Sequence, residues 1–205
     1  MRHGWALLPL LTSLLACDRG GGRDAQTSSV ASPSALPASS LAQHPSPAPE
    51  AWRWPSQAKT DGTFTAGIVD YRPAPVEVAL LTEVRAAKHD GFDRVVFELG
   101  RGSPPGYHLE YVDRPVRQCG SGEPTPIAGD AWLEVRLEPA SAHTTSGDPT
   151  IAHREQMVGL PVVLELEQTC DFEAQVVWVL GVKKPNKYRV STLDEPLRLV
   201  VDVKH

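Results

Sequence analysis

Apolar and polar residues alternate along much of the chain after residue 100, which is the pattern of β-strands that bury one face. Residues 106–113 (GYHLEYVD) and 131–139 (AWLEVRLEP) show it most clearly. The other strand candidates are short runs rich in β-branched and aromatic residues between Gly, Pro and Asp, at residues 76–89, 93–100, 162–170, 173–183, 188–192 and 197–204. Because no segment has a convincing helical period, the pattern predicts an all-β fold of about eight strands, an antiparallel sandwich or barrel.

One long segment breaks this pattern. Residues 140–161 (ASAHTTSGDPTIAHREQMVGLP) do not alternate, and we predict a long connection or a short helix there. Unusually long loops in compact domains often carry function, so this segment is a candidate for part of a site.

The apolar stretch from Trp5 to Leu15 near the start of the chain has a different meaning. It is too short to cross about 30 Å of hydrocarbon as a helix, so residues 1–16 are predicted to be a signal peptide. The sequence LLAC at 14–17 resembles the lipobox of bacterial lipoproteins, whose cysteine receives diacylglycerol before the signal is cleaved.

Two processing routes are compatible with this N-terminal sequence. In an ordinary secretory signal, cleavage after Ala16 would leave Cys17 as a free thiol, which has no evident use in an oxidising compartment. In a lipoprotein, Cys17 becomes the acylated first residue, carrying fatty acids such as palmitate, and each buried methylene contributes about 0.8 kcal/mol to membrane binding. We therefore expect a lipid anchor at Cys17 on the extracytoplasmic side of a bacterial membrane.

Residues 17–61 have the composition of a disordered tether. Residues 25–49 contain no Asp, Glu, Lys or Arg and consist mostly of Ser, Ala and Pro, which offer too little apolar surface to offset the entropy of ordering. Trp52 and Trp54 end this segment. They either stack on sugars or headgroups as an exposed pair, or fold back onto the domain, which we favour because large aromatic side chains are seldom left exposed.

The remaining residues, 62–205, form one domain's worth of sequence. From Glu77 onward there are 14 Lys and Arg against 20 Asp and Glu, a net charge of −6. This balance argues against nucleic acid as a partner, since a phosphate backbone requires a concentrated basic face. The basic cluster of Lys183, Lys184, Lys187 and Arg189 has the composition of a charged hairpin turn, or of a contact for an anionic polymer.

Catalytic and metal-binding patterns are absent from the sequence. There is no GxSxG elbow, HExxH, phosphate loop or Cys-x-x-Cys. His143 and His153 lie in the irregular segment and are expected to be solvated, and the alternating Glu165 and Glu167 are expected to share one solvent-exposed face of a strand. We therefore predict no enzyme activity, no cofactor and no metal.

Five blocks in one order resemble the AMIN-like domain of bacterial envelope lipoproteins. They are VRAAKHDGFDRVVFELG (84–100), GYHLEYVD (106–113), GSGEP (120–124), GDAWLEVRL (129–137) and the closing WVLGV…YRVSTLDEPLRLVVDV (178–203). The resemblance covers about residues 80–204. It implies a β-sandwich distantly similar to the AMIN domain, which binds peptidoglycan and directs amidases and secretins to the envelope.

The strongest of these blocks supplies most of the candidate ligand residues. Asp90 and Gly91 favour a tight turn before Asp93 and Arg94. Arg94 either pairs with Asp93, Glu98 or Asp202, which we favour, or offers its planar fork to a ligand carboxylate such as those of wall peptides. Tyr107 and Glu123 complete the candidate ligand set with Asp90, Asp93 and Arg94. Glu123 lies in GSGEP, which is either a backbone nest for an anion or a plain loop.

After export, Cys119 and Cys170 are the remaining cysteines besides Cys17. We predict a disulfide between them, which would stabilise the fold by about 4 kcal/mol in the chain-entropy model. The alternative is two buried free thiols, whereas metal binding lacks the required spacing.

These observations favour a non-catalytic binding domain anchored in the cell envelope. One hypothesis is binding to peptidoglycan or another wall glycan, and the alternative is an interaction module that docks onto an envelope enzyme or assembly by strand addition or a sandwich face. A groove rimmed by Arg94, Tyr107 and residues 120–124 would favour the wall ligand, and an apolar patch or open sheet edge would favour a protein.

Overall fold

The structure, a computed structural model, describes residues 53–56, 62–74 and 77–205, which all belong to one compact unit from Pro47 to His205. The predicted signal peptide, Cys17, most of the predicted tether and Trp52 lie outside the described residues.

The described residues form eleven β-strands and no α-helix, which confirms the all-β prediction. Eight strands correspond to those predicted from the sequence, and three short strands were not predicted. The strands are β1 (Val69–Tyr71), β2 (Ala79–His89), β3 (Phe92–Arg101), β4 (Gly106–Val112), β5 (Ala131–Glu138), β6 (Ala140–Ser141), β7 (Glu155–Met157), β8 (Val163–Phe172), β9 (Gln175–Val182), β10 (Tyr188–Asp194) and β11 (Leu197–Lys204).

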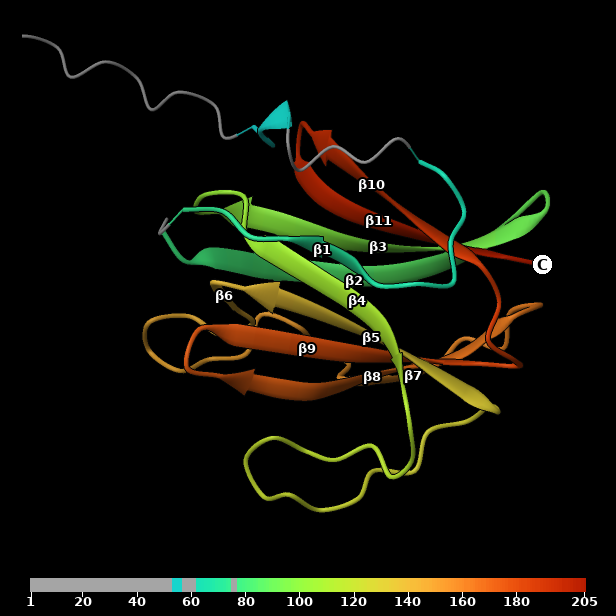
Figure 1. Cartoon of the computed structure of the whole chain (residues 1–205). Helices are drawn as coiled ribbons and strands as arrows, with labels where there is room; N and C mark the ends of the chain where they lie inside the picture. Colours follow the sequence, from blue (N-terminus) through green and yellow to red (C-terminus); the bar gives the residue numbers. More distant parts are fainter. Residues whose placement is uncertain (1–52, 57–61, 75–76) are drawn as a thin grey trace, which may run out of the picture. The chain divides into compact units, whose positions relative to one another are not determined.

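The strands form two packed sheets, so the fold is a β-sandwich rather than a barrel (Figure 1). One sheet has six strands in the order β1-β4-β5-β9-β8-β7, and the other has five in the order β10-β11-β3-β2-β6. Every neighbouring pair is antiparallel except β2 and β6.

The core lies between the inner faces of the two sheets. Every second residue of β3 and β5 is buried in it, as the alternating sequence predicts. Phe97 of β3 meets Trp178 of β9 edge to face, with ring centroids 6.4 Å apart. Trp54 joins the same core with only 2% of its surface exposed, so for this residue the prediction that it folds back onto the domain is confirmed. A core residue thus precedes residue 62, where the sequence analysis placed the start of the domain.

A second, smaller apolar cluster covers part of the outer face of the six-stranded sheet. Val116 and Ile127, from the loop between β4 and β5, pack on Val179 of β9. The predicted disulfide is confirmed, with Cys119 of this loop bonded to Cys170 of β8. Gly181 allows the loop to lie close, since a Cβ there would overlap the carbonyl oxygen of Ala128.

The irregular segment 140–161 contains no helix. It holds the short strands β6 and β7 joined by turns, and Asp171 of β8 anchors it by accepting hydrogen bonds from the Ala142 amide (2.9 Å) and the His143 ring (2.8 Å). The segment was hard to assign from the sequence because two-residue and three-residue strands carry almost no periodic signal.

Candidate functional site

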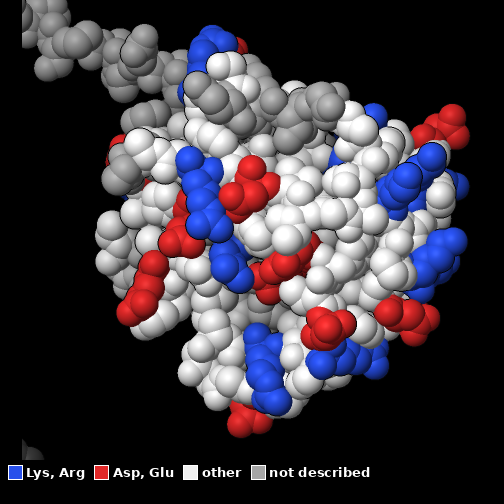
Figure 2. All heavy atoms as spheres, in the orientation of Figure 1, with Lys and Arg blue, Asp and Glu red and all other residues white. Residues whose placement is uncertain are grey.

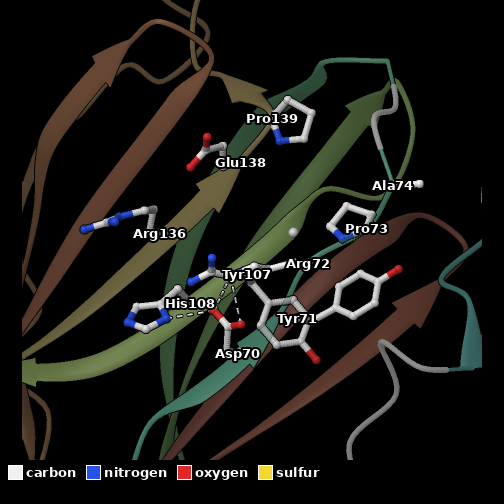
Figure 3. Close-up of a pocket in the computed structure, with 11 residues that line it drawn as sticks. Asp70, Tyr71, Arg72, Pro73, Ala74, Tyr107, His108, Arg136, Glu138 and Pro139 are labelled. Atoms are coloured by element: carbon white, nitrogen blue, oxygen red, sulfur yellow. Dashed lines mark hydrogen bonds and ion pairs between the residues drawn. The ribbon is translucent and has the colours of Figure 1, made fainter.

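A cleft of about 430 Å³ opens where β1, β4 and β5 lie side by side in the six-stranded sheet. Figure 2 shows acidic and basic side chains next to one another on the face of the molecule that carries β1 and β4. Figure 3 shows the side chains that line the cleft, among them Asp70, Tyr71, Arg72, Tyr107, His108 and Arg136. The cleft therefore combines aromatic rings with charged groups of both signs.

Strand register brings these side chains together. β1 pairs with β4 so that Asp70 lies opposite His108 and Tyr71 opposite Tyr107, and β4 pairs with β5 so that His108 lies opposite Arg136. Because side chains alternate across a strand, Asp70, His108 and Arg136 form one polar row on the outer face. The two tyrosines belong to the neighbouring row, which faces inward.

A glycine allows the strands to approach one another at the end of the cleft. A Cβ at Gly106 would lie 2.8 Å from the carbonyl oxygens of Tyr71 and Glu138 and from Cδ of Pro73. Glycine is thus required here by close approach of the backbones, and the cleft depends on it for its shape.

Asp70 in this polar row has two side-chain partners. Nδ1 of His108 lies 2.8 Å from Oδ1 of Asp70, while Nε of Arg72 lies 3.1 Å from the other carboxylate oxygen of Asp70. The hydrogen bond from His108, aided by Arg72, holds the pKa of the Asp70 carboxyl below its ordinary value. Asp70 is therefore a charged acceptor at neutral pH, and the side chain of Arg72, 82% exposed, keeps most of its donors accessible.

The two tyrosine rings of the cleft pack against each other and against Trp54. The rings of Tyr71 and Tyr107 lie 5.6 Å apart, and Trp54 contacts Tyr107 edge to face at 6.0 Å. Burial raises the pKa of Tyr107 to about 12, so its hydroxyl stays neutral. Tyr107 is buried and supports Tyr71, which is only half-buried and is the ring that a ligand can reach.

The five ligand residues predicted from the sequence lie on three parts of the fold. Tyr107 lines the cleft, Asp90, Asp93 and Arg94 belong to the β2–β3 hairpin in the other sheet, and Glu123 is exposed in the β4–β5 loop. The groove that the sequence analysis described, rimmed by Arg94, Tyr107 and residues 120–124, is thus not formed.

Two of the predicted ligand residues have partners within the chain. Arg94 makes a bidentate ion pair with Asp202, at 2.7 and 2.9 Å, which confirms the pairing favoured from the sequence. Asp93 is fully buried and accepts hydrogen bonds from the amides of Val162 (2.6 Å) and Val163 (2.9 Å). This geometry gives Asp93 a structural role inside the sandwich.

The polar row could not be predicted from the sequence because strand β1 was not predicted. Three residues, VDY, are too few to show a period, although the alternation of residues 106–113 does place His108 on the face opposite Tyr107. Within the described part of the chain, no group of three or more His, Cys, Asp or Glu is arranged to hold a metal ion.

A second cluster of charged groups lies under the disulfide-linked loop. Glu165 and Glu167 are 4% and 9% exposed, so the prediction that they face solvent is wrong, because the β4–β5 loop covers them. Glu165 accepts a hydrogen bond from the Ala128 amide at 2.6 Å, and Glu167 receives only a long one, 3.3 Å, from Gln118. Burial raises the pKa of Glu167 to about 7, and repulsion from Glu155 and Glu165 adds to this shift. The β4–β5 loop thus covers the carboxyl group of Glu167, which becomes charged near neutral pH.

Fold and cleft together define a β-sandwich domain with a polar and aromatic surface cleft. The family model of the AMIN-like domain matches residues 79–205, and the chain belongs to this family. AMIN-like domains are generally non-catalytic binding or interaction modules associated with the cell wall and envelope. Searches among curated proteins and solved structures gave no match.

Among the described residues, no helix is long and apolar enough to span a bilayer.

We predict that Glu167→Gln removes a pH dependence of stability. The folded protein binds the Glu167 proton up to about pH 7, while the unfolded chain releases it near its ordinary pKa of 4.5, so stability falls as pH rises through this interval. In urea unfolding at about pH 5 and about pH 8, this group should cost the wild-type protein up to about 3 kcal/mol at the higher pH.

In Glu167→Gln this loss should disappear, whereas the exposed Glu123→Gln should keep it. An equal pH dependence in the wild-type protein and Glu167→Gln would show that Glu167 titrates normally.

Proposed function

We propose that this protein is an envelope lipoprotein whose domain binds peptidoglycan or another cell-wall glycan in the cleft between β1, β4 and β5. The observation that carries the proposal is the reachable ring of Tyr71, supported by Tyr107, beside a row of paired charged groups. Membership of the AMIN-like family supports the same ligand class.

The chemistry of the cleft suits a sugar. Sugar rings present C–H faces that pack on aromatic side chains, and hydroxyl and acetamido groups that need donors and acceptors. Asp70 and Glu138 provide acceptors, while Arg72 and Arg136 provide charged donors that also suit the carboxylates of wall peptides.

The proposal includes a membrane anchor at Cys17. Residues 17–52, which precede the core residue Trp54, would span on the order of 35 Å as a flexible coil, and more where proline enforces an extended form. This length would let the domain reach wall polymer from the membrane surface.

A second candidate function, docking onto an envelope protein, is favoured by a separate observation. Met157 of β7 is 69% exposed and Phe172 of β8 is 61% exposed. β7 is an edge strand that pairs with only three residues of β8, from Glu165 to Glu167, and Phe172 lies beyond this pairing. An extended segment of a partner could add to this edge and cover the two side chains.

For wall binding, we predict saturable co-sedimentation of the detergent-solubilised full-length protein with isolated sacculi. Tyr71→Ala should weaken binding about tenfold, because it removes the ring on which a sugar packs. Phe172→Ala is the matched control, since it removes an exposed aromatic ring outside the cleft. The measurement is the bound fraction against sacculus concentration at low and physiological salt.

If the wild-type protein stays in the supernatant at both salt concentrations, the wall proposal fails. If Phe172→Ala weakens pelleting and Tyr71→Ala does not, the binding surface is the β7–β8 edge.

For the anchor, we predict that mass spectrometry of the protein from bacterial membranes finds a mature N-terminus at Cys17 carrying acyl chains. Cys17→Ser should abolish acylation, and Cys119→Ser should not affect it, since the thiol of Cys119 is used in the disulfide. A mature chain that begins at an unmodified Cys17 would instead establish an ordinary secretory signal.

A further inference from the structure

Two arginines share one buried carboxylate on the outer face of the five-stranded sheet, away from the cleft. Asp202 of β11 is 1% exposed and lies between Arg94 of β3 and Arg189 of β10 in the strand register. Arg94 donates to it at 2.7 and 2.9 Å, and Arg189 approaches it at 2.8 Å with both Nε and Nη2. One negative charge thus offsets only one of two guanidinium groups.

Each guanidinium keeps donors for another partner. Arginine has five N–H donors, and each of these side chains uses only two nitrogens toward Asp202. About a third of each side chain is exposed, so the remaining donors are accessible from solvent. The shared carboxylate also fixes both guanidinium groups in place before any ligand arrives, which lowers the entropy cost of binding.

Aromatic rings hold the same arginines from the sides. Arg189 lies 4.7 Å from the ring centroid of Phe64 and 5.1 Å from that of Phe92, and Arg94 lies 5.2 Å from that of Phe92. Cation–π contacts of this kind restrict the guanidinium planes without neutralising their charge. The arrangement is therefore rigid and positively charged.

Two exposed lysines extend the positive charge. Lys204 follows Asp202 by two residues on the same face, with its ammonium 5.8 Å from the Phe64 ring, and the carbonyl of Lys187 accepts the Lys204 amide. Among the described residues, no carboxylate pairs with either lysine. Figure 2 shows Lys and Arg side chains along the flank where Figure 1 places the β2–β3 hairpin and the C-terminus.

The balance of charge around Arg94 and Arg189 differs from that around the other arginines on the same face. Arg85 of β2 is paired with two carboxylates, Glu83 at 2.6 Å and Glu98 at 3.0 Å, and has no surplus charge. Arg198 of β11 donates to the backbone carbonyls of Glu195 and Pro196 and is not part of the cluster around Asp202. In the part of the chain that the structure describes, Arg94, Arg189, Lys187 and Lys204 set four basic side chains around one buried carboxylate, although the net charge of the chain is −5.

We propose that Arg94, Arg189, Lys187 and Lys204 form a binding site for a phosphoryl group, separate from the glycan cleft and independent of the function proposed for it. A phosphoryl group presents several oxygens and up to two charges, which match two fixed guanidinium groups and a lysine rim better than one carboxylate does. In an envelope, this chemistry is offered by phospholipid headgroups and by phosphorylated wall polymers.

The test uses inorganic pyrophosphate as the probe and calorimetry on the full chain held in nanodiscs of phosphatidylcholine. Pyrophosphate should bind, with an affinity that falls as salt is added. Arg189→Gln should weaken binding at least about tenfold, because charge-assisted hydrogen bonds are lost. Lys187→Gln combined with Lys204→Gln should also weaken it, and these two exposed side chains can be replaced without disturbing the core.

Arg198→Gln is the matched control, since it removes one arginine from the same sheet outside the cluster. Absence of pyrophosphate binding at low salt, or equal weakening by Arg198→Gln, would overturn the proposal. A second set of nanodiscs containing phosphatidylglycerol identifies the source of the phosphoryl group. Anionic headgroups that occupy the site should lower the apparent affinity for pyrophosphate, whereas an unchanged affinity excludes the anionic headgroup as the source.

Discussion

The buried carboxylate of Asp93 is the constraint on which the arrangement of the two sheets depends. It belongs to β3 of the five-stranded sheet but accepts its hydrogen bonds from the amides of Val162 and Val163, where β8 of the other sheet begins, and from the ring of His205. Burying a carboxylate costs several kcal/mol unless donors surround it. Hydrophobic contacts are non-directional, whereas this set of directional hydrogen bonds fixes the position of β8 relative to β3 at this end.

The same constraint explains what lies on the outer face. Because strand residues alternate, fixing Asp93 inward places Arg94 outward, beside Asp202 and Arg189. On the six-stranded sheet, the loop between β4 and β5 covers the outer face of β9, held by the disulfide and by close approach at Gly181. The end formed by β1, β4 and β5 remains hollow, and the cleft that we propose as the glycan site lies there. Each sheet thus presents one polar surface to solvent.

The sequence predicted the fold better than the site. Eight strands could be predicted because each is seven or more residues long and shows alternation or a β-branched run bounded by turn residues. Cys119 and Cys170 could be paired because they were the cysteines left once Cys17 was assigned to the anchor. The short strands β1, β6 and β7 escaped prediction because two or three residues form strands only through their tertiary partners.

The site depends on those tertiary partners. Asp70 and Tyr71 become site residues only when β1 pairs with β4, which no local pattern indicates. Likewise, Arg94 and Arg189 are far apart in the chain, and only the order β10-β11-β3 places them on the two sides of Asp202. Among the predicted ligand residues, Tyr107 lines the cleft as part of a buried support.

NMR titration of the full-length protein with a soluble disaccharide-peptide fragment of peptidoglycan would show whether the β1–β4–β5 cleft binds wall glycan. We expect progressive shifts of the backbone amides of Tyr71, Arg72 and His108, with those of Met157 and Phe172 unchanged. Shifts confined to the β7–β8 edge, or none at saturating fragment, would contradict it.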